Sequence, residues 1–178
     1  MAKSETEPRV FYRDVRYARL EFRTGSLQVI LPRGGEVAVL MDNKKDWINK
    51  KEEFINECLK SAQDKELVSR SEEDFRNAVN LSVLDASSSL GVEVNSVRFR
   101  LMKTKWASCS PKRNLILNSL MRYLPGYLIA YVIFHETAHI IEKKHNDRFW
   151  RQVANNFKNH DELEKDLFAY WFLIQAAG

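Results

Sequence analysis

The sequence predicts an α+β protein that forms a single domain over residues 1–178. Apolar and polar residues alternate in two separate stretches, residues 15–35 and 96–118, which indicates short strands. Between and after these stretches, apolar residues recur at three- and four-residue steps, which indicates helices. With 44% hydrophobic and 11% aromatic residues, a chain of 178 residues can bury a core without disulfide bonds.

The first alternating stretch predicts a β-hairpin. Its two halves flank Thr24, Gly25 and Ser26, and a proline and two glycines at positions 32–35 end it. From Glu36 to Leu59 the spacing becomes helical, with a break near residues 42–43. Residues 37–41 alone would also fit a strand, but the spacing that follows favours a helix.

The next helix has signals at both ends. Ser71 followed by Asp74 resembles a capping box, and Gly91 follows the last apolar residue of the helical pattern. Two short alternating runs then follow, residues 96–103 and 114–118, with a turn-forming segment at residues 110–113. We expect them to form a second hairpin.

A buried helix is predicted after this hairpin. Leu124, Pro125 and Gly126 interrupt the chain, and every residue from 127 to 134 is apolar. Such a helix can be buried on most of its faces.

The charge and the two cysteines restrict the class of protein. A net charge of +4 would suit nucleic acid, but the lysines at positions 44–51 are followed directly by Glu52 and Glu53, which is typical of a solvated helix face. Cys58 and Cys109 form no C-x-x-C pair, so neither a disulfide framework nor a zinc ribbon is indicated. These features favour a reducing, cytoplasmic location.

No membrane association is expected. The longest apolar runs, residues 127–134 and 167–174, are far shorter than the roughly 20 residues needed to span a bilayer. The polar N-terminus lacks the apolar region of a signal peptide, and residues 1–8 are expected to form a disordered tail. The apolar segment near the C-terminus would then be either core or an interface.

Three of the four histidines lie between residues 135 and 145, in the segment HETAHIIEKKH. In a helix, His135 and His139 project from one face and can bind one metal ion, as in the H-E-x-x-H motif of zinc peptidases. Glu136 lies about 100° around the helix. It is therefore placed to act as a general base on metal-bound water and not as a ligand on that face.

His145 requires a turn to join this pair. On a straight helix it would point about 80° away from the direction of His135. We expect the helix to end near residues 143–144 and a new helix to begin at Asn146 or Asp147, both good N-caps. His145 could then become the third nitrogen ligand, with the fourth zinc position left for water.

Other polar residues have less specific explanations. The H-E-x-x-H motif could arise by chance in a buried helix, although unpaired buried imidazoles are costly. His160, in a polar segment, is expected at the surface or as a helix cap. Trp106 and Cys109 are expected to pack in the core, although Cys109 could lie near a metal. Asn118 could orient a metal ligand or the strand.

Several motifs together resemble the YgjP-like metallopeptidase family, relatives of the SprT proteases. They are W-A-S-C-S at residues 106–110, L-I-L-N at 115–118, Leu-Pro at 124–125, and YVIFHETAHIIEKKHNDRFW at 131–150. The resemblance covers residues 98–153 most closely and the preceding hairpin and helix more loosely.

This resemblance implies a small zincin-like domain in which a short antiparallel or mixed sheet packs on the H-E-x-x-H helix. It also implies that His135, His139 and His145 bind the metal and that Glu136 is the catalytic base. The family usually has glycine where this chain has Ala107, which could alter a close backbone approach.

The sequence therefore predicts a peptidase that binds one Zn²⁺ per chain and hydrolyses a peptide or protein substrate. The alternative is a non-catalytic, zinc-stabilised binding module, such as a basic adaptor for nucleic acid. Such a module would need the ion but not Glu136.

Overall fold

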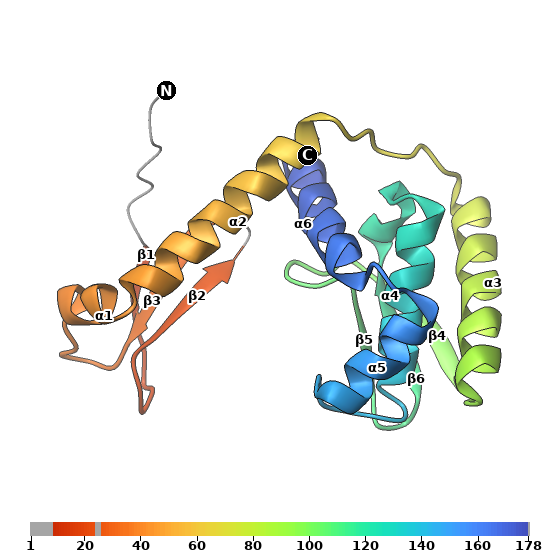
Figure 1. Cartoon of the computed structure of the whole chain (residues 1–178), viewed down its shortest axis with the longest axis horizontal. Helices are drawn as coiled ribbons and strands as arrows, with labels where there is room; N and C mark the ends of the chain where they lie inside the picture. The colour runs from red at the N-terminus through yellow and green to blue at the C-terminus, as the bar shows by residue number, and fades with distance from the viewer. Residues whose placement is uncertain (1–8, 24–25, 178) are drawn as a thin grey trace.

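The structure is a computed structural model that describes residues 9–23 and 26–177 (Figure 1). The predicted N-terminal tail and the turn residues Thr24 and Gly25 lie outside the described residues. The elements in chain order are β1 (Arg9–Tyr12), β2 (Arg19–Arg23), β3 (Ser26–Leu31), α1 (Val37–Asn43), α2 (Lys45–Gln63), α3 (Glu72–Leu90), β4 (Ser96–Arg100), β5 (Ala107–Cys109), β6 (Asn114–Asn118), the 3-10 helix η1 (Ser119–Tyr123), α4 (Gly126–Ala138), α5 (Asp147–Asn156) and α6 (His160–Ala177).

The first sheet has the order β1-β3-β2. Strands β2 and β3 are antiparallel, as the predicted hairpin requires, and the parallel strand β1 was not predicted. Three consecutive residues of β3, Val29, Ile30 and Leu31, are buried. This central strand therefore has both of its faces covered.

The second sheet corrects the predicted second hairpin. Its order is β4-β6-β5, and β4 runs parallel to β6, so these two strands cannot form a hairpin. The hairpin consists instead of β5 and β6, which are antiparallel. The prediction chose the wrong partner for β6 because β5 has only three residues and gives a weak strand pattern. Its pairing occupies one edge of β6, and β4 therefore pairs with the opposite edge.

The helix boundaries largely follow the sequence signals. The break between α1 and α2 falls at Lys44, next to the predicted position. Ser71 caps α3 by accepting a hydrogen bond from the backbone N–H of Asp74 at 3.0 Å. Gly91 ends the same helix with a left-handed φ of 63°, which glycine adopts without a steric penalty. No helix in the described part of the chain is long and apolar enough to cross a membrane.

The main hydrophobic core surrounds α4. This helix packs against α3 and against β5 of the second sheet. The core includes residues of α3, β6, α4, α5 and α6 (Figure 1), among them Val79, Leu117, Ile133, Phe149 and Leu167. Among the described residues, the buried side chains of β3 lie outside this cluster. The first sheet therefore has its own apolar contacts.

The C-terminal helix α6 connects two parts of the molecule: the first sheet with α1 and α2, and the core around α4. It packs along α2, as Figure 1 shows. Phe54 of α2 and Phe168 of α6 meet edge to face at 5.3 Å, and Nζ of Lys65, just after α2, lies 2.8 Å from Asp166 Oδ1. Leu167 on the same helix belongs to the main core. The apolar C-terminal segment thus serves as core within this chain.

Candidate metal centre

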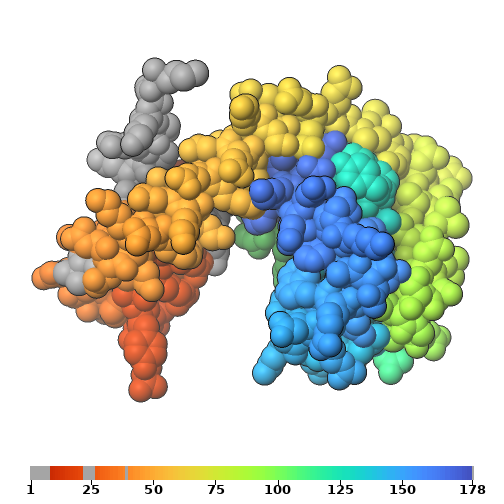
Figure 2. Space-filling view, in the orientation of Figure 1, coloured from red at the N-terminus to blue at the C-terminus, as the bar shows by residue number. Residues whose placement is uncertain are grey.

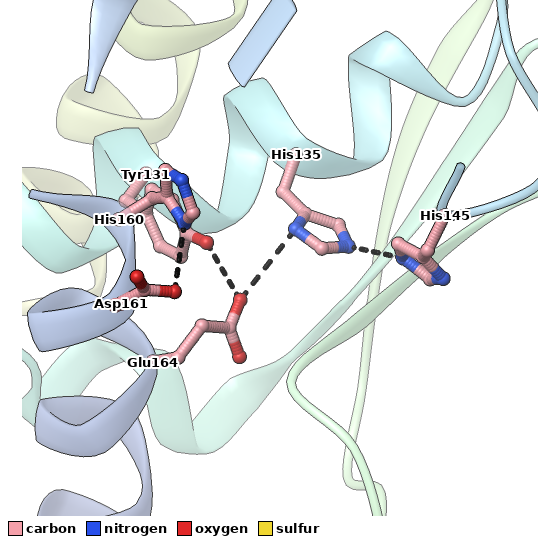
Figure 3. A network of polar contacts seen from close by, with 6 residues as sticks. All are labelled: Tyr131, His135, His145, His160, Asp161 and Glu164. Atoms are coloured by element: carbon pink, nitrogen blue, oxygen red, sulfur yellow. Dashed lines mark hydrogen bonds and ion pairs between the residues drawn. The ribbon is translucent and has the colours of Figure 1, made fainter. Parts of the chain in front are cut away.

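The structure brings together three of the four histidines. Ring nitrogens of His135, His139 and His145 all lie within 4.8 Å of one another. His135 Nε2 and His145 Nε2 are 2.9 Å apart (Figure 3). His135 and His139 are partly buried, whereas His145 is exposed, so the cluster opens to solvent on the side of His145.

A turn after α4 places His145, but it begins earlier than the sequence suggested. Helix α4 ends at Ala138, and the prediction that it extends to residues 143–144 is wrong. A helix of that length would have directed His145 away from the other two rings. The backbone instead closes one last turn, in which Glu142 N–H donates to the carbonyl of Ala138, and then reverses.

The start of α5 fixes the other end of this turn. As predicted, Asn146 caps α5, and its Oδ1 accepts hydrogen bonds from the backbone N–H groups of Arg148 and Phe149. The fully buried Phe149 ring contacts the three imidazoles, stacking on His139 at 4.6 Å and meeting His135 and His145 edge to face. An apolar floor therefore supports the cluster.

A hydrogen bond sets the tautomer of His139, and a nearby carboxylate orients the ring of His135. His139 Nδ1 lies 3.0 Å from the carbonyl oxygen of Glu142, which can only accept, so Nδ1 carries the proton and Nε2 keeps a free lone pair. His135 Nδ1 faces Glu164 Oε1 at 3.6 Å, just beyond hydrogen-bonding distance (Figure 3). This arrangement likewise directs His135 Nε2 toward the other two rings.

Burial favours the neutral form of His135 and His145. It is the largest cause of the lowered pKa of His135, which falls to about 3, and His139 and His145 lower it further. Burial followed by His139 also lowers the pKa of His145. Only neutral imidazoles bind metal, so both shifts favour metal binding at neutral pH.

Glu164 and Tyr131 are members of the site that the sequence did not reveal. The Tyr131 hydroxyl donates a hydrogen bond of 2.6 Å to Glu164 Oε1, the same oxygen that faces His135 (Figure 3). Tyr131 is one helical turn before His135 on α4, a spacing that could have suggested a neighbour. Glu164 comes from α6, within a polar run that carries no distinguishing pattern.

Glu136 is a residue of α4, and its side chain contacts the edge strand β5. Burial is the largest influence on its carboxyl group and raises its pKa, while His139 and a hydrogen bond from the backbone of Cys109 lower it. Burial, with a smaller contribution from Glu136, in turn raises the pKa of the Cys109 thiol. The backbone of β5 thus holds the Glu136 carboxylate. This carboxylate is not part of the group of three ring nitrogens.

The remaining predicted residues have structural contacts. Asn118 is fully buried, and its side chain bonds the backbone of Met102 and Lys105, so it holds the segment between β4 and β5. Trp106 meets Trp171 edge to face at 4.9 Å, as expected for packing.

His160 is more buried than predicted. It begins α6, its ring stacks on Trp150 at 5.0 Å, and its side chain is only 19% exposed. It does not belong to the cluster of three histidines.

The residues present fit a metal ion. Zinc binds histidine nitrogen at about 2.0–2.1 Å in a tetrahedral arrangement, which places ligand nitrogens roughly 3.3 Å apart. The three nitrogens, all within 4.8 Å, need only small side-chain movements to reach this arrangement. The exposed side at His145 leaves space for water or substrate.

The family comparison agrees with this site. Residues 61–170, more than half of the chain, match the YgjP-like, metallopeptidase domain family. The chain belongs to this family, and the resemblance seen in the sequence is confirmed. It is therefore a hydrolase of the metallopeptidase class, whose activity depends on a divalent metal and whose substrates are proteins or peptides.

Two solved structures are similar to part of the chain. The metallopeptidase zymogen of Pyrococcus abyssi abylysin is 27% identical, with a TM-score of 0.47, over 50% of this chain and 90% of that one. The metallopeptidase zymogen of Methanocaldococcus jannaschii jannalysin is 28% identical, with a TM-score of 0.46, over 50% of this chain and 92% of that one. No curated protein gives a match.

Proposed function

We propose that this protein hydrolyses peptide bonds with one zinc ion per chain, held by His135, His139 and His145, and with Glu136 as general base. The convergence of three ring nitrogens from two sides of a turn is the observation that carries the proposal. Family membership supplies the reaction class.

The donor set favours zinc. Neutral imidazoles suit zinc, and three of them with one open position are typical of catalytic zinc sites. A zinc ion bound there would supply a Lewis acid that polarises a carbonyl group and lowers the pKa of water. The histidines are neutral, so they do not cancel the ion's double charge.

Glu136 is suited to move the proton. Its carboxylate accepts a proton from the attacking water and returns it to the leaving amine. The backbone N–H of Cys109 orients this carboxylate, and burial keeps its pKa above the ordinary range. A raised pKa brings a carboxylate closer to the working pH, which improves it as a base.

Strand β5 is suited to position the substrate. It is an edge strand of the second sheet, and Cys109 at its end touches Glu136 through its backbone. An extended peptide that paired with the outer edge of β5 would pass close to Glu136. Main-chain hydrogen bonds would then hold the cleaved bond in place without depending on side-chain identity.

The substitution Glu136→Gln tests the mechanism. It nearly preserves volume and touches no proposed ligand, so zinc content and melting temperature should stay close to wild type. Hydrolysis of a peptide that wild type cleaves should fall by roughly 100-fold or more. Glu53→Gln, the same change at an exposed position of α2, is the matched control and should retain full activity.

Equal cleavage by wild type and Glu136→Gln, with zinc still bound, would contradict the proposed mechanism. A non-catalytic zinc module predicts that Glu136→Gln behaves as wild type in every assay. If that module were an adaptor for nucleic acid, its DNA binding would also weaken steeply with salt.

A further inference from the structure

We propose that the cavity between α2, α6 and the segment preceding β5 binds a large apolar side chain of the peptide substrate. This inference rests on the proposed peptidase function and adds to it a substrate class. The enzyme would select peptides that carry an aromatic or large aliphatic residue near the cleaved bond.

The cavity has the size and the walls of a side-chain pocket. Its volume is about 590 Å³, within the range of about 300–1,000 Å³ typical of small-ligand sites. In Figure 2 the molecule is hollowed between the orange N-terminal part and the blue C-terminal helices. Aromatic rings from both parts line the cavity, namely Trp47, Phe54, Trp106, Phe168, Trp171 and Phe172.

The charges around the cavity favour an uncharged occupant. Lys51 and Lys105 contribute two positive charges to the lining, and Glu21 and Glu164 contribute two negative charges. An acidic side chain would be repelled by the two glutamates, and a basic side chain would be repelled by the two lysines. An apolar side chain avoids this conflict and gains contact with the rings.

The cavity adjoins the candidate metal centre through two residues. Glu164 lines it and also lies 3.6 Å from His135 Nδ1. Trp106 lines it and directly precedes β5, whose last residue, Cys109, bonds Glu136.

The spacing of Cys109 and Trp106 determines how far the selected side chain can lie from the cleaved bond. A peptide paired with β5 advances about 3.3 Å per residue, so the three residues from Cys109 to Trp106 correspond to roughly 10 Å. A side chain within about three residues of the cleaved bond can therefore reach the cavity.

Part of the wall comes from outside the region that matches the family. Five lining residues, Glu21, Trp47, Lys51, Phe54 and Ile55, precede residue 61, where the family match begins. The N-terminal sheet and α2 thus acquire a role in substrate selection that the metal site itself does not require.

Cleavage mapping provides the first test. Wild type is incubated with peptides of alanine, glycine and serine that carry one phenylalanine, and the products are identified by mass spectrometry. The cleaved bond should lie at a fixed distance from the phenylalanine and should move by one residue when the phenylalanine moves by one. Cleavage at bonds unrelated to its position would overturn the pocket and leave the peptidase function intact.

Peptide binding provides a test that does not depend on turnover. In a Glu136→Gln background, fluorescence anisotropy compares labelled peptides with phenylalanine, alanine or aspartate at the selected position. The phenylalanine peptide should bind about 10- to 200-fold more tightly than the alanine peptide. Adding Phe168→Ala should lower this ratio at least about 10-fold, whereas Leu84→Ala, an exposed leucine of α3, should not change it.

Phe168→Ala could disturb the structure by loosening the contact between α2 and α6. A second variant therefore blocks the cavity with a larger side chain. Thr104 lines the cavity from an exposed loop, so Thr104→Trp should fold and obstruct the pocket. Leu101→Trp, at an exposed position of the same loop outside this cavity, is its control.

The outcomes separate the two proposals. Equal binding of the phenylalanine and alanine peptides, or a preference that survives both Phe168→Ala and Thr104→Trp, would overturn the pocket. A preference that these variants abolish, in a protein whose wild type cleaves none of the peptides, would support the pocket and overturn the peptidase function.

Discussion

The two sheets of this protein have the same design but different roles. Each has three strands in which the first pairs parallel with the third and the second pairs antiparallel with it. In the described part of the chain, the second sheet contacts α4, which carries His135, through β5. Strand topology alone therefore does not create the site.

The first long helix after each sheet, α2 or α4, explains the difference. Most residues of α4 are buried, whereas α2 buries only Ile48, Cys58 and Ala62 and exposes a row of lysines and glutamates. The charged side chains on α2 remain hydrated, and the charges of its lysines and glutamates offset one another. His135 on α4 is desolvated and kept neutral, a state suited to metal binding.

Removal of single histidines should give the largest contrast. His139→Ala and His145→Ala each delete one of three proposed ligands, so zinc affinity should fall by more than the about 10–100-fold that outer partners of a metal site contribute. His160→Ala, which removes the one histidine outside the cluster, should keep wild-type affinity. Competition with a chromogenic chelator measures all three.

Zinc removal independently tests the difference between the clustered histidines and His160. Chelation should lower the melting temperature of wild type and of His160→Ala, because zinc stabilises only the folded state that binds it. Wild-type zinc affinity in His145→Ala would mean that the turn after α4 does not supply a ligand.

Leucine truncations in the two sheets should separate stability from metal binding. Leu117 in β6 and Leu31 in β3 are both almost fully buried, and each change to alanine should cost about 2–5 kcal/mol of unfolding free energy. Only Leu117 belongs to the core around α4, so only Leu117→Ala should also weaken zinc binding. Equal losses of zinc affinity would show that the first sheet supports the metal centre.

Local patterns predicted much of this molecule. The spacing of His135 and His139, the cap at Asn146 and the cap at Ser71 each depend on neighbours within a few residues, and the structure has them at the expected places. The need for a turn before His145 followed from helix geometry alone.

Apart from the end of α4, which was placed too late, the errors concern contacts between distant residues. The parallel pairing of β4 with β6 depends on β5, whose three residues give no clear alternation. Glu164 reaches His135 from a helix that begins well after the motif, and no local signal records that contact. Tertiary packing decides such features.

Substitutions of Glu164 and Tyr131 should have intermediate effects. Glu164→Gln removes the charge that faces His135 Nδ1, which should weaken zinc binding by about 10- to 100-fold. The controls lie on the same two helices, where Tyr127 donates an analogous hydrogen bond of 2.9 Å to Asp166. Asp166→Asn should leave zinc affinity unchanged.

The tyrosines extend this comparison. Tyr131→Phe removes the hydrogen bond to Glu164 and should weaken zinc binding less than Glu164→Gln, whereas Tyr127→Phe should have no effect on it. A loss of affinity in Tyr127→Phe as large as in Tyr131→Phe would attribute both effects to the packing of α4 on α6.

The smallest expected effect concerns the helix caps of the two parts. Helix α3, which packs on α4, has the Ser71 side-chain cap, whereas Lys44, the N-cap residue of α2, makes no side-chain cap hydrogen bond. Ser71→Ala leaves the N–H of Asp74 without this acceptor and should lower the unfolding free energy by about 1 kcal/mol. Ser89→Ala, at an exposed position of α3, should instead be neutral or slightly stabilising, because alanine favours a helix interior. Urea denaturation of both variants measures the difference, and equal free energies would mean that the cap contributes nothing to the part of the fold that holds the histidines.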